Sequence, residues 1–360
     1  MGPESVSVAR SRAVEMSEAA GVVIGPLKGY HHETYVIPLP GRTELVKLRE
    51  PRTGLLWFDR RCFASEEQLL RALTGQITRV PQIFEVAGIG LQVFIEGRTI
   101  GARRWTGRRV PDAIHDQIVG RFREMARIVP SSLSVERRCD LSDRSGDGDT
   151  SRFLDGLIAF VEERVYAGNH AEFGDLFEEL GVGSDAFVRL RKHVLGPGLS
   201  ERPFCLLHAD LHRENFIVDD EGRLWTIDWE LAMVGDPLYD LATHLYLMRY
   251  PSDQQRRMTE DWCRAVESVH PGASHGWADD LPLLLDFKRA QSVFTDVIRV
   301  SLSLRDGAEI NWVALPQAAG KLQRTLAAAA VPLGLVEVPS RSQIMAALVS
   351  WLRGTAMAPA

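Results

Sequence analysis

The fold of this 360-residue chain is decided by one stretch, LLHADLHRENFIVDDEGRLWTIDWELAMVGDPLYDL, which runs from Leu206 to Leu241. His208, Asp210 and Asn215 lie on a polar loop between two apolar runs, and Asp228 directly follows a third apolar run. Carboxylate and amide oxygens are ligands that Mg²⁺ prefers, and a carboxylate can also accept a proton from a hydroxyl group. The stretch therefore predicts a site suited to phosphoryl transfer, which needs one proton acceptor and two oxygen donors for the metal.

Two regions of different character flank this stretch. From Gly21 to about Ile95, short β-branched and apolar runs broken by Gly and Pro predict a small antiparallel sheet, with one helix over Phe63–Leu73. After Gly97 the chain is dominated by long amphipathic segments typical of helices. We therefore expect an α+β chain with an N-terminal lobe over residues 1–96 and a helical C-terminal lobe over residues 97–360.

Composition and charge narrow the class of partner. The chain has 45% hydrophobic and 25% charged residues and a net charge of −6, so it offers no cationic field for nucleic acid or anionic lipid. A small molecule is the expected ligand.

The segment 130–151 is dense in Ser, Asp, Gly and Arg, which predicts a surface loop.

The cysteines and the N-terminus bear on the expected compartment. The four cysteines, at positions 62, 139, 205 and 263, lie far apart and form no CxxC pair, so we expect reduced thiols and not a disulfide framework or zinc site. The N-terminus carries acidic residues where a signal peptide has its apolar core, and no run of about eighteen apolar residues occurs. We expect a cytoplasmic protein without a membrane partner.

Three motifs in the central stretch carry a resemblance to a known family. They are HADLHREN from His208 to Asn215, IDW from Ile227 to Trp229, and GDPLYDLA from Gly235 to Ala242. Together they resemble the signature of the aminoglycoside phosphotransferase and choline kinase branch of the protein-kinase-like fold. The resemblance implies a bilobal fold, with a small antiparallel sheet and one helix in the first lobe and a larger, mainly helical second lobe.

The resemblance also implies roles for residues of these motifs. Asp210 would be the catalytic base, and Asn215 and Asp228 would hold Mg²⁺. Three further residues would brace the catalytic loop by hydrogen bonds: His208, Asp236 and Asp240. Read alone, HADLH could instead be a metallohydrolase motif, but no additional His-rich motif accompanies it.

The nucleotide is expected in the N-terminal lobe, beginning with a turn and a strand. Gly25 and Gly29 lie in a turn between two apolar strands, as in a loop that covers phosphates, although a plain hairpin fits this stretch equally well. Lys47 lies inside an apolar strand, where an ammonium needs an anionic partner. The resemblance implies that this partner is Glu66 at the start of the first helix, with Glu67 as the competing choice.

A hinge after the fifth strand is expected to contact the purine through backbone groups. The resemblance assigns this hinge to Phe94, Ile95 and Glu96, without separating ATP from GTP. His31 and His32 lie at the edge of the phosphate turn, where adjacent histidines are usually exposed; a direct role in binding is the less favoured alternative.

The acceptor is the least determined part of the prediction. From Leu241 to Ala360 the chain has eleven Asp and Glu against twelve Lys and Arg, so it shows no surplus of carboxylates for a polycationic aminoglycoside. The balance favours a neutral or acidic acceptor such as a nucleoside or sugar antibiotic. The candidate acceptor residues are Trp277, Lys288, Arg299, Arg305 and Trp312.

The sequence thus predicts an Mg²⁺-dependent O-phosphotransferase, monomeric or homodimeric, that uses ATP or GTP to modify and inactivate an antibiotic. One alternative is a kinase of a primary metabolite such as choline, homoserine or a sugar. Another is a non-catalytic nucleotide-binding pseudokinase, which the presence of Lys47, Asp210, Asn215 and Asp228 disfavours. A protein kinase is disfavoured because no Asp-Phe-Gly or Ala-Pro-Glu motif follows the metal strand.

Overall fold

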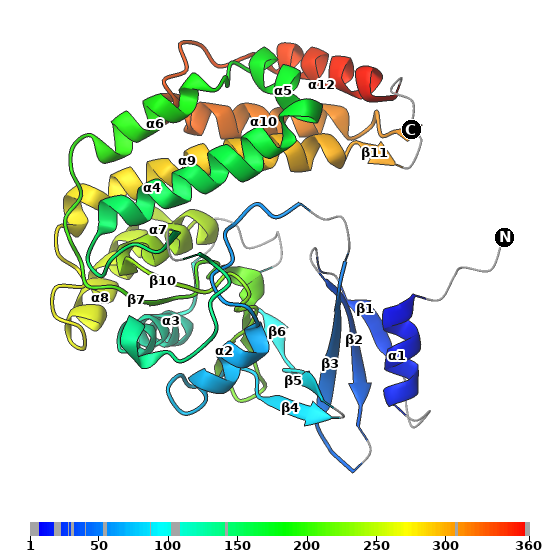
Figure 1. Cartoon of the computed structure of the whole chain (residues 1–360), viewed down its shortest axis with the longest axis vertical. Helices are drawn as coiled ribbons and strands as arrows, with labels where there is room; N and C mark the ends of the chain where they lie inside the picture. The colour runs from blue at the N-terminus through cyan, green and yellow to red at the C-terminus, as the bar shows by residue number, and fades with distance from the viewer. Residues whose placement is uncertain are drawn as a thin grey trace.

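The computed structural model describes residues 7–17, 23–27, 29, 32–39, 41–52, 56–86, 88–101, 109–140, 143–306 and 309–356. Two lobes face each other, with the sheet of the first at one end and the helices of the second at the other (Figure 1). The predicted α+β, bilobal architecture is confirmed. No helix in the described ranges is both long enough and apolar enough to cross a membrane.

The N-terminal lobe is built on a five-stranded antiparallel sheet with the strand order β1-β2-β3-β5-β4. The strands are β1 (Ile24–Leu27), β2 (His32–Pro38), β3 (Leu45–Pro51), β4 (Ile83–Val86) and β5 (Ile89–Val93). Helix α1 (Val8–Met16) packs against β2 and β3 and buries Ala9 and Ala13. The sequence predicted only one helix in this lobe. It missed α1 because the buried residues of this helix are two small alanines among charged neighbours, which form no apolar stripe.

Helix α2 (Glu66–Leu73) is the helix that the sequence predicted. Ser65 caps it by accepting a hydrogen bond from the backbone N–H of Gln68 at 3.2 Å. Leu69, Leu70 and Leu73 lie on its buried face and join the large hydrophobic core that continues through the C-terminal lobe. The sheet, by contrast, has a separate small core of buried residues: Ala9, Ala13, Tyr35, Ile37, Leu39, Val46, Leu48 and Leu91.

The chain crosses between the lobes at Gly97. Strand β6 (Arg98–Thr99) leaves the N-terminal sheet and pairs with β8 (Phe216–Val218), which also pairs with β9 (Leu224–Thr226). Gly97 has φ +147°, and a Cβ atom there would lie 2.4 Å from the carbonyl oxygen of Val218, so only glycine fits. We infer that the lobes divide at Glu96 and Gly97.

The C-terminal lobe is mainly helical, with α9 at its centre against α6, α7 and α10 (Figure 1). Its helices are α3 (Asp112–Ala126), α4 (Thr150–Phe160), α5 (His170–Glu179), α6 (Asp185–Leu195), α7 (Pro237–Met248), α8 (Ser252–Glu267), α9 (Trp277–Leu302), α10 (Leu315–Ala328), α11 (Ala330–Leu333) and α12 (Arg341–Ala356). A π-helical turn, Val161–Tyr166, extends α4. Strands β7 (Cys205–Leu207) and β10 (Met233–Gly235) pair antiparallel, as do β11 (Arg305–Asp306) and β12 (Glu309–Ile310).

The segment 130–151 was predicted to be a surface loop, but part of it is built into the core. Leu133 and Cys139 are buried, and the backbone pairs with the segment before α2. The N–H of Ala64 donates to the carbonyl of Glu136 at 3.0 Å, and the N–H of Arg138 donates to the carbonyl of Cys62 at 2.8 Å. These contacts join the start of α2 to the C-terminal lobe.

Candidate active site

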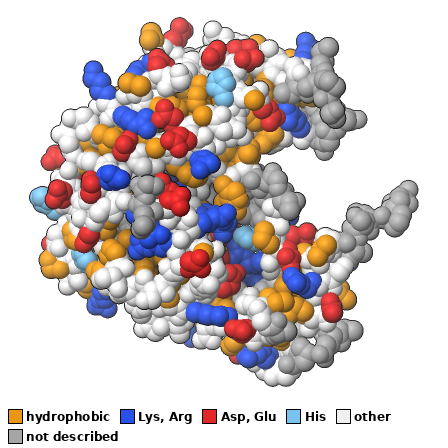
Figure 2. All heavy atoms as spheres, viewed as in Figure 1, with side chains coloured by type: hydrophobic (Ala, Val, Ile, Leu, Met, Phe, Trp, Pro, Cys, Tyr) orange, Lys and Arg blue, Asp and Glu red, His pale blue; other side chains and the backbone are white. Residues whose placement is uncertain are grey.

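A cavity of about 860 Å³ lies between the lobes and is lined by eight of the predicted site residues: Gly29, Lys47, Phe94, Asp210, Asn215, Asp228, Lys288 and Arg299. Figure 2 shows the molecule hollowed there, with basic and acidic side chains at the inner end of the hollow. The cavity is lined from the N-terminal lobe by Lys47, Arg49 and Phe94 and from the C-terminal lobe by Asp210, Asn215, Asp228 and one face of α9.

The loop that carries Asp210 is held by two buried polar groups. The carboxylate of Asp240, in α7, accepts hydrogen bonds from the backbone N–H groups of His208 at 3.1 Å and Ala209 at 2.7 Å. His208 Nε2 lies 3.1 Å from the carbonyl oxygen of Ile227, and its ring packs against Trp229 at 4.6 Å between centroids. Burial lowers the pKa of His208 to about 4, so the imidazole is neutral and donates from Nε2.

Asp236 lies behind this loop and does not reach the cavity. It caps α7 by accepting a hydrogen bond from the N–H of Leu238 at 2.8 Å, and its carboxylate is paired with Arg202. The guanidinium of Arg202 also donates to Asp280 Oδ2 at 2.6 Å. All three side chains are buried, so this cluster supports the scaffold below the loop that carries Asp210.

Asp210 is held through one of its two carboxylate oxygens. Asn215 Nδ2 donates to Oδ2 of Asp210 at 3.0 Å and to its backbone carbonyl at 2.9 Å. His212 Nε2 lies 3.3 Å from the same Oδ2 atom. Because His212 Nδ1 accepts the backbone N–H of Glu214 at 3.1 Å, its proton is on Nε2 and faces Asp210. No group in the described part of the chain hydrogen-bonds Oδ1 of Asp210, so this atom is open to a ligand.

Asp228 has a carboxylate oxygen without a hydrogen-bond partner. Its Oδ1 atom is buried and unbonded, and the nearest cation, Arg49 Nη2, is 3.7 Å away. Burial, together with the charge of Glu66, raises the pKa of Asp228 to about 6 despite the opposing charge of Arg49. An anionic oxygen in this setting favours a bound cation. Asn215 uses its amide nitrogen on Asp210, which leaves its amide oxygen as a second donor, so the two residues fit Mg²⁺.

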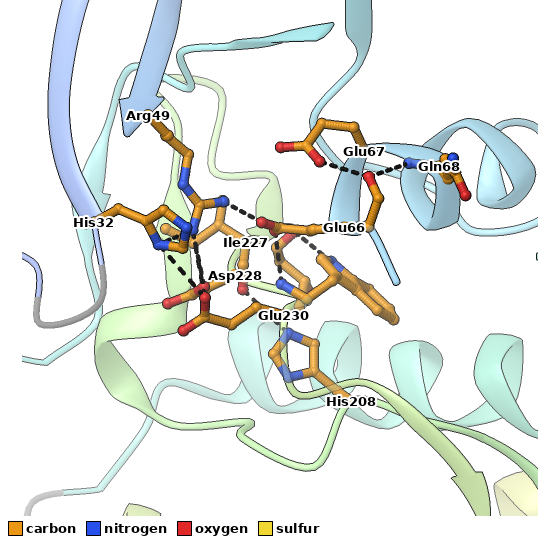
Figure 3. Close-up of polar contacts among 12 residues, drawn as sticks. His32, Arg49, Glu66, Glu67, Gln68, His208, Ile227, Asp228 and Glu230 are labelled. Atoms are coloured by element: carbon orange, nitrogen blue, oxygen red, sulfur yellow. Dashed lines mark hydrogen bonds and ion pairs between the residues drawn. The ribbon is translucent and has the colours of Figure 1, made fainter. Parts of the chain in front are cut away.

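Glu66 is paired with Arg49, and this corrects the predicted Lys47–Glu66 pair. Figure 3 shows the Arg49 guanidinium pointing from β3 toward Glu66 at the start of α2, next to Asp228 and Glu230. The N–H of Trp229 also donates to Glu66 Oε1 at 2.8 Å. Burial raises the pKa of Glu66, but the charge of Arg49 and this hydrogen bond outweigh it, so the pKa lies below its usual value.

Lys47 lies two residues before Arg49 on the same strand, and both line the cavity because side chains of a strand alternate between faces. The Lys47 ammonium lies 5.9 Å from the centroid of the Phe94 ring, and no carboxylate in the described residues lies within ion-pair distance. Burial and the neighbouring charge of Arg49 lower the pKa of Lys47. Lys47 is therefore a half-buried cation without a bonded anion among the described residues.

From the sequence, His32 and Glu67 had only less favoured roles and Glu230 had none. His32 Nδ1 lies 3.2 Å from Arg49 Nη2 and 3.5 Å from Glu230 Oε2, so this histidine joins the charged cluster at the cavity wall. Glu67 instead accepts a hydrogen bond from Ser65 Oγ at 2.7 Å, at the start of α2. His31 lies outside the described residues.

The remaining nucleotide candidates divide between the cavity and its surroundings. Gly29 and Phe94 line the cavity. Gly25, Ile95 and Glu96 do not; Ile95 is buried and Glu96 is exposed. Because a purine would be bound at this hinge by backbone groups, these side chains carry little information about it.

Of the acceptor candidates, Lys288 and Arg299 line the cavity, whereas Trp277, Arg305 and Trp312 do not. Trp277 is the first residue of α9, eleven positions before Lys288, which at 1.5 Å per residue is about 16 Å along the helix. Arg305 pairs with Glu172 and lies over the Trp351 ring. Trp312 is 49% exposed outside the cavity. Their distance from Asp210 in space was not visible in the sequence.

The two-lobed fold, with a strand cation paired to a helix acid above an HxD loop, defines a phosphotransferase of the protein-kinase-like class. The chain belongs to the phosphotransferase enzyme family, whose model matches residues 23–277. A curated relative, protein LicA from Haemophilus influenzae, is 33% identical over 63 residues, which are 18% of this chain and 23% of the relative. The match thus spans less than a quarter of the curated relative.

Solved structures share the fold over most of the chain. Choline kinase LicA from Streptococcus pneumoniae is 19% identical and superposes with a TM-score of 0.52 over 90% of this chain and 99% of its own. The gentamicin-APH(2")-IIa complex has 13% identity and a TM-score of 0.52 over 95% and 99% of the chains. Macrolide 2'-phosphotransferase MphH from Brachybacterium faecium has 15% identity and a TM-score of 0.50 over 91% and 100%. These structures include both antibiotic and choline kinases.

Proposed function

We propose that this phosphotransferase transfers the γ-phosphoryl group of ATP or GTP to a hydroxyl of a small molecule, with Asp210 as the base. The observation that carries the proposal is the asymmetry of the Asp210 carboxylate. Oδ2 is held by Asn215 and His212, while Oδ1 is open toward the cavity that also contains Asn215, Asp228 and Lys47. A proton acceptor, two metal donors and a cation for phosphate thus surround one space.

In this proposal Oδ1 of Asp210 accepts the proton of the acceptor hydroxyl as its oxygen attacks the γ-phosphorus atom. The bond between that phosphorus and the bridging oxygen breaks, and the nucleoside diphosphate leaves. Asn215 and His212 keep the carboxylate oriented throughout, because both donate to the oxygen that does not face the hydroxyl.

The phosphates would be bound by Lys47 and by a metal. Asn215 and Asp228 would hold Mg²⁺, which would neutralise charge on the phosphate oxygens. Lys47 is the cation available to a phosphate oxygen, because the Arg49 guanidinium is already paired with Glu66. Arg49 would instead fix α2 against the sheet.

For the acceptor we favour a nucleoside or sugar antibiotic, inactivated by phosphorylation; a primary-metabolite kinase remains the alternative because choline kinases share the fold. The test is release of ADP or GDP, with Mg²⁺, over a panel of nucleosides, sugars, macrolides, aminoglycosides and choline. The wild type should release diphosphate with at least one acceptor, and Asp210→Asn should not. Failure to turn over either nucleotide with any acceptor, or with water, would reject the proposed function.

A further inference from the structure

One face of α9 lines the cavity opposite the sheet. Its members recur at helical spacing and are all polar: Lys288, Gln291, Ser292, Thr295 and Arg299. Two of them are cations and none is an acid. Because Asp210 lines the same cavity, a molecule that offers a hydroxyl to Asp210 would also contact this face.

Lys288 is the most buried charge on this face, with 6% of its surface exposed. Its ammonium donates to Gln291 Oε1 at 2.7 Å and to the Tyr239 hydroxyl at 3.3 Å, and both partners are neutral. No carboxylate in the described residues lies within ion-pair distance of it. An ammonium has three N–H donors, so one remains for a ligand.

The surroundings nevertheless keep Lys288 charged. Burial disfavours the ammonium, but Tyr239, Asp59 and Asp210 outweigh it, so the pKa of Lys288 lies above its usual value. Asp59 is linked to Lys288 through Gln291, whose Nε2 donates a hydrogen bond to Asp59 Oδ1 at 2.8 Å. Lys288 is therefore a charged ammonium held in the cavity wall by two neutral hydrogen-bond partners, with one N–H left to donate to an anionic ligand.

We propose, building on the phosphotransferase function above, that the acceptor is a hydroxyl compound with an anionic group that binds Lys288 while its hydroxyl reaches Asp210. Arg299, one turn beyond Thr295 and exposed, lies at the outer end of the same face and would attract the anion toward the cavity. A polycation would meet two positive charges here. The proposal covers carboxylates and phosphate esters alike, since both are anions with oxygen acceptors.

The test compares acceptors that differ mainly in charge. Diphosphate release is measured with gluconate and glycerol 3-phosphate as anionic acceptors, sorbitol and glycerol as neutral ones, and glucosamine and choline as cationic ones. We expect kcat/KM to be highest for an anionic acceptor. Lys288→Met should lower that value by about 30-fold or more, because a desolvated charge pair loses its cation. The loss should be smaller for the neutral acceptors than for the anionic one, and Lys288→Arg should recover part of it.

A control and a second readout make the outcome decisive. Lys192→Met, on the exposed surface of α6, should leave every value unchanged. In thermal unfolding, an anionic acceptor should raise the Tm of the wild type but not of Lys288→Met. Preference for glucosamine or choline, or an equal loss on all acceptors and water in Lys288→Met, would overturn the inference while leaving the phosphotransferase function intact. Absence of any nucleotide turnover would instead reject the function itself.

A second inference concerns Cys62 and Cys139. Their sulfur atoms are 3.7 Å apart, and both residues are buried. Cys62 lies just before α2, and Cys139 lies in the segment 130–151, which is hydrogen-bonded to it. A small cavity of about 70 Å³ is lined by both cysteines and by Arg60, Arg137 and Arg144. The Cys62 thiol as hydrogen-bond donor, helped by Arg144, lowers the pKa of Cys139 to about 6.

The geometry points to a reversible disulfide between these two residues, formed by a peroxide. The Cys139 thiolate attacks one oxygen of hydrogen peroxide, giving a sulfenic acid and, after protonation, water. The Cys62 sulfur then attacks the sulfenic sulfur, losing its proton and releasing a second water. Two thiols lose two electrons and the peroxide gains them. The bond would tie the start of α2 covalently to the C-terminal lobe.

Mass analysis of the alkylated protein after brief peroxide treatment tests this. We expect a peptide linking Cys62 to Cys139 and a raised Tm, both reversed by dithiothreitol. Cys62→Ser and Cys139→Ser should each abolish the link and the Tm change, whereas Cys263→Ser, at a site away from the pair, should retain both. Oxidation of Cys139 to sulfinic acid without a linked peptide, or a link that involves Cys205 or Cys263, would overturn the inference.

Discussion

Two arginines, Arg49 and Arg202, each lie among carboxylates, and they differ in how completely those carboxylates are bonded. Arg202 is fully buried and donates directly to Asp236, to Asp280 and to the carbonyl of His275. Both of its carboxylates also accept a backbone N–H, from Leu238 and from Ser200 at 2.8 and 2.9 Å. Every charge in this cluster has a partner.

The Arg49 cluster includes a buried carboxylate oxygen, Oδ1 of Asp228, without a hydrogen bond. Arg49 pairs directly with Glu66, while Asp228 and Glu230 lie 3.7 Å from its guanidinium. Burial, followed by the charge of Asp228, raises the pKa of Glu230 to about 8. The comparison teaches that a complete set of hydrogen bonds marks the scaffold, whereas an unbonded carboxylate oxygen at the cavity marks the place that a metal and its nucleotide would complete.

The largest expected effect is on the cavity side of this comparison. Asp210→Asn removes the base but keeps the contacts with Asn215, so kcat should fall by about 10² to 10⁴ while the Tm stays near that of the wild type. Steady-state diphosphate release and thermal unfolding measure the two. Asp220→Asn, an exposed change in a nearby turn, is the control. Near wild-type kcat in Asp210→Asn would remove this residue from the chemistry.

On the scaffold side, Asp280→Asn should act on stability. It leaves the buried Arg202 with one carboxylate fewer, and breaking a buried pair costs about 3–5 kcal/mol of the free energy of unfolding. Urea unfolding measures the loss, with the exposed neighbour Asp279→Asn as the control. If Asp280→Asn and Asp279→Asn had the same effect on the free energy of unfolding, the Arg202 cluster would not be structural.

Asp228→Asn should separate the two clusters by their response to metal. Mg²⁺ should raise the Tm of the wild type and of Asp280→Asn, because each retains the cavity carboxylate, but it should not raise the Tm of Asp228→Asn. Turnover should disappear only in Asp228→Asn. An unchanged Mg²⁺ response in that variant would place the metal elsewhere.

Lys47→Met and Arg49→Met should show that the two cations of β3 have different roles. Arg49→Met leaves Glu66 buried without its partner and should lower stability by about 1–3 kcal/mol. Lys47→Met removes a half-buried cation that has no bonded carboxylate in the described residues, so stability should hold while the KM for nucleotide rises. If Arg49→Met raised the KM for nucleotide and Lys47→Met lowered stability instead, Arg49 would be the phosphate-binding cation.

The smallest expected effect is on pH dependence without metal. The folded-state pKa of Asp228 is about 6 against an ordinary value of 3.8, so the folded protein binds more protons than the unfolded chain between these values. The free energy of unfolding should therefore fall as pH rises from 4 to 6. Asp228→Asn should flatten this slope, and urea titrations at several pH values without Mg²⁺ measure it. A slope unchanged in the variant would assign it to another group.

The local signature could be predicted from sequence, whereas the partners across the cavity could not. HADLHREN fixes Asp210 and Asn215 on one short loop, so their proximity follows from spacing alone. Lys47 and Arg49 occupy the same face of β3, and which of them reaches Glu66 depends on how α2 docks on the sheet. The cavity face of α9 likewise depends on which part of that helix lies beside the cavity, and Trp277, about 16 Å before Lys288 along the helix, falls outside it.

The division of the hydrophobic cores has a mechanical consequence. Glu66 stands on a helix anchored in the large core, while Arg49 stands on a sheet whose own core has eight buried residues. Their ion pair therefore joins the sheet to the large core, together with the contacts of α2 with β4 and β5. Loss of the Arg49–Glu66 pair would weaken the contact between the sheet and α2, while α2 would remain packed in the large core. Amide hydrogens of β2 and β3 should therefore exchange before those of α2.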